Sequence, residues 1–337
     1  MQEQKRPIIL YGMGNGADKI FALFDAYGIT VSGIFASDEF VRGHSFHGYH
    51  VDTYAQTVAR WGEDIIIIPA FASSIPSVMR RFEELDDRHT VRFVDLPVVG
   101  NSIFDAVFLK VHQEEIAKAF GLLQDEASRA LFEDIISFRI TGELRYIKNT
   151  TEKQQAFALL VLGEDEIYAD FGAYNGDTIE ELLAYTKRIS KVIAVEPDAK
   201  NFAKLQKMMA GSANVALYHA AVWNEDGEKL RFMQQGGRHS MLHGQGKQEV
   251  STITGDTLLS EGATYIKMDV EGAEKEALLG LKRTLKAYQP KLCVSAYHRH
   301  EDIFSLPLLI HSLNPSYKLY LRRHPYYPAW DLNIYAK

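Results

Sequence analysis

Acidic residues and glycines occur together at one junction of the sequence where chemistry could take place. Asp170, Gly172 and Gly176 form the pattern D-x-G-x-x-x-G within DFGAYNGD, directly after an apolar segment that predicts a strand. Glycines at such a junction let the backbone approach a ligand closely, and the following helix begins with free N–H groups. The spacing differs from the G-x-G-x-x-G of dinucleotide-binding loops. The segment therefore predicts a ligand-binding turn, and a plain tight turn is the structural alternative.

A second acidic residue, Glu196, ends the next predicted strand and is followed by Pro197. A carboxylate at this position can accept hydrogen bonds from both hydroxyl groups of a ribose. Two acidic residues also favour a cationic cofactor. S-adenosylmethionine combines a sulfonium, an amino group and a ribose, and it has no phosphate. We therefore predict S-adenosylmethionine as the cofactor.

Candidates for acid–base chemistry end two later predicted strands. Asp269 ends TYIKMD, Glu271 follows it in the turn, and His298 ends KLCVSAYH. Transfer of a methyl group to an alcohol needs a group that removes the hydroxyl proton. We predict that Asp269 or His298 does so. The alternatives are that Glu271 supplies favourable charge at a helix N-terminus and that His298 is a structural, hydrogen-bonded histidine.

Residues that could contact an acceptor are more scattered, and no metal is predicted. Carboxylates and histidines at strand ends can ligate Mg²⁺ or Mn²⁺, but nothing in their spacing requires an ion. A glycine-rich segment, residues 236–246, could close over a substrate or could be an ordinary solvated loop. The candidate acceptor-binding residues are Tyr146, Arg238, His239, Ser240, Glu271 and His324.

Four segments resemble the FkbM family of S-adenosylmethionine-dependent methyltransferases. They are DFGAYNGDT from Asp170, VEPD from Val195, IKMDVEGAE from Ile266 and SAYH from Ser295. The resemblance spans about residues 125–337 and implies a seven-stranded Rossmann-like methyltransferase fold, with O-methylation of a sugar or a natural product. At matching positions it implies a set of cofactor-binding residues, namely Asp170, Gly172, Ala173, Gly176, Glu196, Pro197, Ala221 and Val222.

The elements that must position these residues alternate along the chain. Continuous apolar strands that alternate with helices predict parallel α/β sheets covered on both faces. We predict a smaller Rossmann-like α/β domain at residues 1–100, a helical connector at 101–162 and the methyltransferase domain at 163–337. The last domain should have seven strands, and a short loop joins the last two, which predicts an antiparallel pair.

The first 100 residues carry a weaker signal of their own. Gly12-Met-Gly14-Asn-Gly16 is one residue short of the dinucleotide spacing. The segment resembles the N-terminal Rossmann-like domains of sugar O-acyltransferases, which implies binding of a nucleotide-sugar. The alternative is a docking or dimer surface, and hence a homo-oligomer. Two other functions stay open: an NAD(P)-dependent oxidoreductase that uses these glycines, and a non-catalytic protein that binds a nucleotide or nucleotide-sugar.

The amino-acid composition limits which kinds of partner and which cellular compartment we expect. The 337 residues have a formal net charge of −7, which argues against a nucleic-acid partner because phosphate contacts need a cationic face. Apolar runs are far shorter than the roughly 20 residues of a membrane span. A single cysteine, Cys293, excludes an internal disulfide. We therefore expect a cytoplasmic protein that acts on a small molecule, with neither a nucleic acid nor a membrane as partner.

Overall fold

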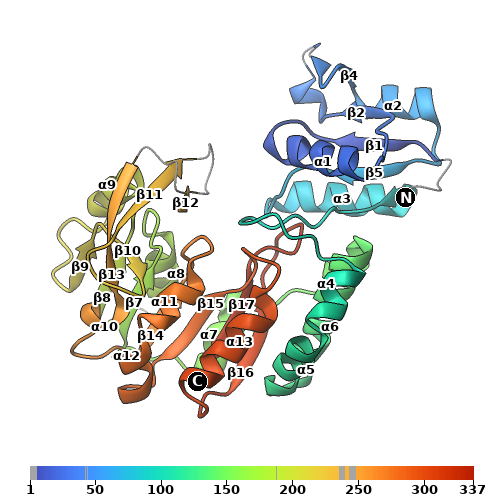
Figure 1. The fold of residues 1–337 in the computed structure, drawn as a ribbon. Helices are drawn as coiled ribbons and strands as arrows, with labels where there is room; N and C mark the ends of the chain where they lie inside the picture. The colour runs from blue at the N-terminus through green and yellow to red at the C-terminus, as the bar shows by residue number, and fades with distance from the viewer. Residues whose placement is uncertain (1–5, 42, 44, 187, 235–239, 243–247) are drawn as a thin grey trace.

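The structure is a computed structural model that describes residues 6–337 apart from 42, 44, 187, 235–239 and 243–247. Two largely parallel sheets account for most of its strands, and a run of helices separates them in sequence (Figure 1). The predicted α/β class with a Rossmann-like seven-stranded sheet is confirmed. Among the helices of the described residues, none is both long and apolar enough to cross a bilayer.

The first sheet has six strands in the order β3-β4-β2-β1-β5-β6. Its strands are β1 (Ile8–Tyr11), β2 (Gly33–Phe35), β3 (Ser45–Phe46), β4 (Tyr49–Asp52), β5 (Ile66–Pro69) and β6 (Thr90–Val91). Its helices are α1 (Asn15–Ala26), α2 (Tyr54–Trp61) and α3 (Pro76–Arg88), with a 3₁₀ turn η1 (Asp38–Phe40). The sequence of residues 90–97 predicts one strand, but β6 ends at Val91, because the N–H of Phe93 donates to the carbonyl of Gly142 and not to β5.

Alternating side chains bury both faces of this sheet, as expected for parallel strands. Leu10, Ile34 and Ile68 pack on one face against the apolar side of α1. Ile9 and Ile67 point to the other face, where Phe82 and Leu85 of α3 cover them. A sheet covered on both faces can present a ligand site only along its strand ends and not on its faces.

A helical segment follows the first sheet. It contains α4 (Ala106–Val111), α5 (Gln113–Leu122), α6 (Glu126–Thr141), the turn η2 (Leu144–Ile147) and α7 (Lys153–Leu160). Asp125 caps α6 by accepting a hydrogen bond from the N–H of Ser128, and Gly142 ends α6 in the left-handed conformation. The Asp125 carboxylate also pairs with Arg322 at 2.5 Å, which fixes α6 against the C-terminal sheet.

The second sheet has seven strands in the order β16-β17-β15-β14-β7-β8-β9. Its strands are β7 (Ile167–Phe171), β8 (Lys191–Val195), β9 (Val215–Tyr218), β14 (Tyr265–Met268), β15 (Lys291–Ser295), β16 (Leu319–Arg323) and β17 (Leu332–Ala336). The last two strands are antiparallel to each other, as predicted. Its helices are α8 (Asp177–Thr186), α9 (Ala199–Met208), α10 (Gly255–Leu258), α11 (Glu274–Leu279), α12 (Lys282–Ala287) and α13 (Asp302–Leu313).

The two faces of the seven-stranded sheet differ in polarity. One face is aliphatic and packs against α6 and α11–α13 in a core that continues to α3 and the first sheet. The other face carries Tyr168, Tyr265, Cys293 and Tyr335, and it packs against α7, α8 and α9. Polar groups on this second face are unusual for a buried sheet surface, and they extend to the strand ends where the candidate site lies.

A four-stranded sheet was not predicted. It consists of β10 (Ala221–Trp223), β11 (Lys229–Gln234), β12 (Ser240–Leu242) and β13 (Gln248–Thr254), in the order β10-β13-β11-β12. The apolar segment 215–223 predicts a single strand, and this prediction is wrong, since β9 and β10 belong to different sheets. The amphipathic segment 274–288 predicts one helix, but the structure has two, α11 and α12. They are separated at Gly280, where a methyl group would lie 2.1 Å from the carbonyl oxygen of Trp223.

The loop between β16 and β17 joins the two sheets. Ser73 and Tyr327 exchange backbone hydrogen bonds of 2.7 and 2.9 Å. The hydroxyl of Tyr327 donates to Glu83 of α3 at 2.8 Å. The loop is therefore held by residues of the first sheet although it belongs to the second.

Removal of this side-chain hydrogen bond should weaken the junction measurably. For Tyr327→Phe we expect a loss of about 1 kcal/mol in the free energy of unfolding, because one buried hydrogen bond disappears. Urea unfolding followed by circular dichroism measures this loss. Tyr218→Phe, at a half-exposed tyrosine of β9, is the control and should change the value by less than about 0.5 kcal/mol. Equal losses in the two variants would contradict the role given to Tyr327.

Candidate active site

A cavity of about 260 Å³ opens at the carboxyl ends of the strands of the second sheet. It lies where β7 separates β8 on one side from β14 on the other, so the chain reverses its direction of strand addition there. Open α/β sheets bind ligands at such a switch point. The glycine turn follows β7, Glu196 follows β8 and Asp269 follows β14. The fold therefore brings the three predicted acidic segments to one edge.

The glycine turn has the conformation that its sequence predicts. Gly172 and Gly176 adopt φ values of 83° and 95°, in the left-handed region that favours glycine. A methyl group on Gly172 would lie 1.9 Å from the carbonyl oxygen of Asp269. Ala173 between them is fully buried, and its N–H donates to the carbonyl of Val195. The absence of a side chain at Gly172 thus lets the turn after β7 touch the end of β14.

Glu196 is buried at the cavity wall beside Pro197. Its two oxygens accept hydrogen bonds from the N–H groups of Tyr174, at 2.9 Å, and Asp198, at 2.8 Å. Each oxygen keeps a second lone pair for a ligand hydroxyl. Burial raises the pKa of Glu196 to about 7, although the two backbone N–H groups act in the opposite direction.

This pKa predicts a pH-dependent affinity for an adenosine-containing cofactor. Ribose hydroxyls donate to an ionised carboxylate, so protonation of Glu196 should weaken binding. We expect the affinity for S-adenosylhomocysteine to fall roughly tenfold between about pH 8 and about pH 6, because only the ionised fraction accepts both hydroxyls fully. Calorimetric titration across this range measures it. Glu196→Gln should bind more weakly with a flat profile, and a wild-type affinity that does not change with pH would contradict this role.

The remaining predicted cofactor residues divide into two groups. Ala221 and Val222, at the start of β10, line the cavity. Asp170 is fully buried below the cavity surface and is not part of its lining. Its carboxylate accepts a hydrogen bond from Thr178 and lies 3.5 Å from Nζ of Lys267. Asp170 therefore acts on the cavity through Lys267 and not by direct contact.

Asp269 is the partly exposed carboxylate at the end of β14. The hydroxyl of Tyr297 lies 3.4 Å from Oδ1, and Nζ of Lys267 lies 3.9 Å from Oδ2. Burial raises the pKa of Asp269 above its usual value, although Lys267 and His298 lower it. A carboxylate with a raised pKa is a stronger proton acceptor. Asp269 thus has both the exposure and the basicity for the predicted role.

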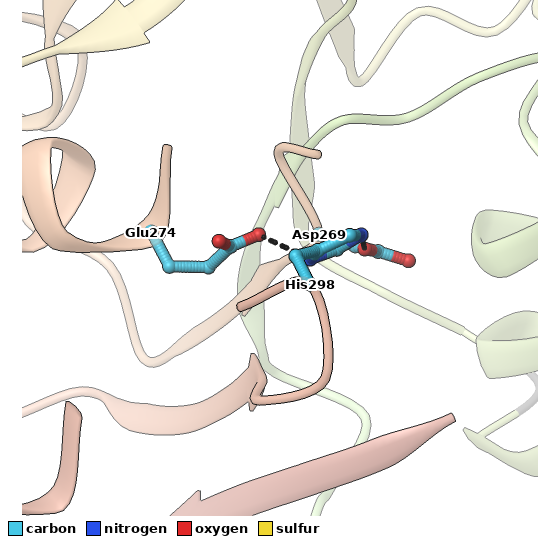
Figure 2. A group of neighbouring side chains, drawn as sticks. All are labelled: Asp269, Glu274 and His298. Atoms are coloured by element: carbon cyan, nitrogen blue, oxygen red, sulfur yellow. Dashed lines mark ion pairs between the residues drawn. The ribbon is translucent and has the colours of Figure 1, made fainter. Parts of the chain in front are cut away.

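His298 lies behind Asp269 and has no exposed surface (Figure 2). Its Nδ1 lies 3.0 Å from Glu274, and its Nε2 lies 3.4 Å from both Asp269 and Glu271. Burial alone would lower the pKa of His298, but Glu274 and the other two carboxylates raise it well above its usual value. A protonated, enclosed imidazole cannot accept a proton from an acceptor. Of the two predicted bases, the geometry favours Asp269, with His298 holding it in place.

Ligand atoms of Asp269, Glu274 and His298 lie within 4.8 Å of one another, close enough to surround a metal ion. The imidazole ring lies between the two carboxylates, with one on each side (Figure 2). Oε1 of Glu274 also accepts hydrogen bonds from the N–H groups of Val270 and Gly272. Metal ligands must face one point. The arrangement fits a charged hydrogen-bonding cluster better than an ion site.

The predicted acceptor residues are dispersed by the structure. Glu271 and His324 line the cavity. His324 is held by the carbonyl of Thr151 and the hydroxyl of Tyr335. Tyr146 lies in η2 under the guanidinium of Arg145 and is not part of the lining. Arg238 and His239 lie outside the described residues. Ser240 belongs to β12, and its side chain is not among those described.

Several cavity residues were missed by sequence reasoning. They are Lys153, Lys267, Tyr297, Tyr326, Trp330 and Asp331. Lys267 had a detectable signal, because it precedes Asp269 by two residues on one strand and therefore shares its face. Tyr326, Trp330 and Asp331 had none, since they lie in a loop whose position depends on the contact with the first sheet.

A second cavity of about 320 Å³ lies at the carboxyl edge of the first sheet, between β1 and β5. Its lining is mainly apolar and includes Phe71, Phe93 and Leu96, with Gly16 at the start of α1. Trp330 lines both this second cavity and the first one, so its indole ring lies between the two cavities. The glycine segment predicted to bind a nucleotide is thus part of a cavity next to the candidate active site.

Comparison with known proteins identifies the family of this domain. Residues 170–326 match the family model described as the methyltransferase FkbM domain. The chain carries an FkbM methyltransferase domain. The match covers the glycine turn, Glu196, Asp269 and His298, so the predicted family is confirmed. The resemblance of the first 100 residues to sugar O-acyltransferases stays a prediction.

A solved structure has the same fold over nearly the whole chain. An FkbM methyltransferase from Methylobacillus flagellatus KT is 18% identical over 98% of this chain and 90% of its own, with a TM-score of 0.74. An rRNA methylase from Streptococcus thermophilus is 14% identical over 57% of this chain and 97% of its own, with a TM-score of 0.37. The second match is too distant to carry an argument. Among curated proteins no match is found.

Proposed function

We propose that the FkbM methyltransferase domain transfers the methyl group of S-adenosylmethionine to a hydroxyl of a small molecule, such as a sugar or a natural product. The observation that carries this proposal is the position of Asp269. It is a partly exposed carboxylate of raised pKa in the same cavity as the glycine turn and the ribose-type carboxylate Glu196. One cavity thus offers a cofactor site and a proton acceptor.

The reaction follows from this arrangement. Bound S-adenosylmethionine would supply a methyl group to the acceptor oxygen, and S-adenosylhomocysteine would be the leaving group. The hydroxyl proton moves to a carboxylate oxygen of Asp269. The protein must hold the two reactants at near-attack distance, and Glu196 and the glycine turn would fix the cofactor end. His298 and Tyr297 orient the Asp269 carboxylate from behind and from the side.

Part of the cavity lining is aromatic, and we assign this part to the acceptor. Tyr326 and Trp330 lie with ring centroids 5.5 Å apart, and Tyr297 stacks on Trp330 at 6.4 Å. Aromatic faces bind the C–H surfaces of sugar rings and the apolar parts of natural products. Glu271 adds a carboxylate that can accept hydrogen bonds from further hydroxyls. This lining supports a hydroxylated small molecule as the acceptor.

A thermal-shift panel distinguishes this function from the NAD(P)-dependent alternative. S-adenosylhomocysteine at millimolar concentration should raise the melting temperature by a few degrees, since a ligand that binds only the folded state stabilises it. NAD⁺ and NADP⁺ should produce no comparable shift. Methyl transfer from labelled S-adenosylmethionine to a panel of hydroxylated acceptors then tests the reaction itself. Stabilisation by NAD(P) alone would overturn the proposal.

A further inference from the structure

Positive charge is scarce in the first cavity. Its lining includes the carboxylates of Asp177, Glu181, Glu196, Asp269, Glu271 and Asp331. Among the described lining residues the lysines are Lys153 and Lys267, and there is no arginine. An acidic cavity suits a sulfonium and an amino group. The same cofactor carries an α-carboxylate, which needs a cation or N–H donors in this surrounding.

The two lysines differ in how their ammonium groups are used. Nζ of Lys153 lies 2.8 Å from Glu181, a normal ion-pair hydrogen bond, and its side chain is 40% exposed. Nζ of Lys267 makes only longer contacts, at 3.4 Å to the carbonyl oxygen of Gly172, 3.5 Å to Asp170 and 3.9 Å to Asp269. Its side chain is 14% exposed. Lys267 therefore keeps donor capacity for a closer partner.

Asp170 explains why this lysine stays charged. The carboxylate has no exposed surface, and its Oδ1 has no hydrogen-bond partner although it lies beside Lys267. Burial lowers the pKa of Lys267, but Asp170 and Asp269 outweigh it and raise the pKa above the usual value. The acidic residue that opens the glycine turn thus maintains a buried ammonium that faces the cavity.

We propose that Lys267 binds the α-carboxylate of S-adenosylmethionine, and that the Gly172 carbonyl accepts the neighbouring α-ammonium. This inference rests on the proposed function and assigns the amino-acid end of its cofactor. An α-amino acid presents adjacent positive and negative groups, and Lys267 with the Gly172 carbonyl presents their complements 3.4 Å apart. Lys267 is also close enough to Glu196 to lower the pKa of that residue. The ribose and the amino acid would therefore be held on opposite sides of the sulfur.

A thermodynamic cycle between protein and ligand tests this pairing. The ligands are S-adenosylhomocysteine and its decarboxylated form, titrated by calorimetry into wild-type protein and into Lys267→Met. The wild type should bind S-adenosylhomocysteine at least about tenfold more tightly than the decarboxylated ligand, as a charge-assisted hydrogen bond predicts. In Lys267→Met the two ligands should bind within about threefold of each other.

Lys153→Met is the matched control, because it removes the other lysine of the same cavity. It should keep the preference of the wild type for the carboxylate-bearing ligand. If Lys153→Met loses the preference while Lys267→Met keeps it, the proposal is overturned. It is also overturned if wild type binds both ligands equally, a result that needs no variant and so does not depend on folding of Lys267→Met. Wild-type protein that binds neither ligand would refute the cofactor and this inference together.

Discussion

Asp269→Asn should abolish most of the methyl transfer and leave cofactor binding almost intact. The substitution keeps the shape of the side chain but removes the proton acceptor at the end of β14. Loss of a general base lowers the rate by about 10² to 10⁴-fold. The affinity for S-adenosylhomocysteine should change by less than about threefold, because no predicted cofactor contact is removed. Single-turnover transfer of a labelled methyl group and calorimetry measure the two quantities.

Glu181→Gln is the matched control for this prediction. It neutralises another carboxylate of the same cavity, one that pairs with Lys153 on the side of α7 and α8. Its transfer rate should stay within about threefold of wild type. A rate for Asp269→Asn close to that of Glu181→Gln would show that Asp269 does not accept the proton. The wild-type rate should also fall at low pH, since protonated Asp269 cannot act as a base.

Gly172→Ala should be the most damaging small substitution in the glycine turn. The added methyl group would lie 1.9 Å from the carbonyl oxygen of Asp269, and the φ of 83° is strained for any residue with a side chain. Backbone strain together with a clash against backbone should cost about 3 kcal/mol or more in the free energy of unfolding. Urea unfolding measures it, and S-adenosylhomocysteine should no longer bind with wild-type affinity.

Gly121→Ala gives the comparison that isolates this effect. Gly121 lies within α5 with open space around it. Alanine has the higher helix propensity, so this variant should be as stable as wild type or more stable by up to about 1 kcal/mol. A loss in Gly172→Ala of less than about 1 kcal/mol would contradict the close approach of β7 and β14 on which the site depends.

The sequence predicted those parts of the molecule that local patterns determine. Apolar strands, the glycine turn after β7 and the carboxylates at strand ends follow from periodicity and from the direction of parallel strands, and the structure brings them to one edge. The sequence alone could not show that His298 is enclosed by three carboxylates, because that depends on how the turn through Glu271 folds back. The position of His298 at the end of a predicted strand suggested a base, but the carboxylates packed around it favour its protonated, cationic form.

Other features could not be predicted because they depend on contacts between segments that are far apart in sequence. The four-stranded sheet pairs β10 with β13 across about thirty residues, and local alternation assigned β10 to the preceding strand. Trp330 reaches both cavities only because Tyr327 pairs with Ser73, which is distant in sequence. Tyr146 precedes the domain closely in sequence, yet it lies in η2 and is not part of the cavity lining. The domain boundaries and the roles of the site residues stay predictions.

Calorimetric titration of the wild-type protein with S-adenosylmethionine shows whether this cavity binds the methyl donor. We expect one binding site per chain, with a dissociation constant in the range of about 1–100 μM near neutral pH. Glu196→Gln, which disrupts the predicted ribose contact, should weaken that binding. Absence of binding at about 1 mM ligand, in protein shown to be folded, would contradict the assignment of this cavity to a methyl-donor cofactor.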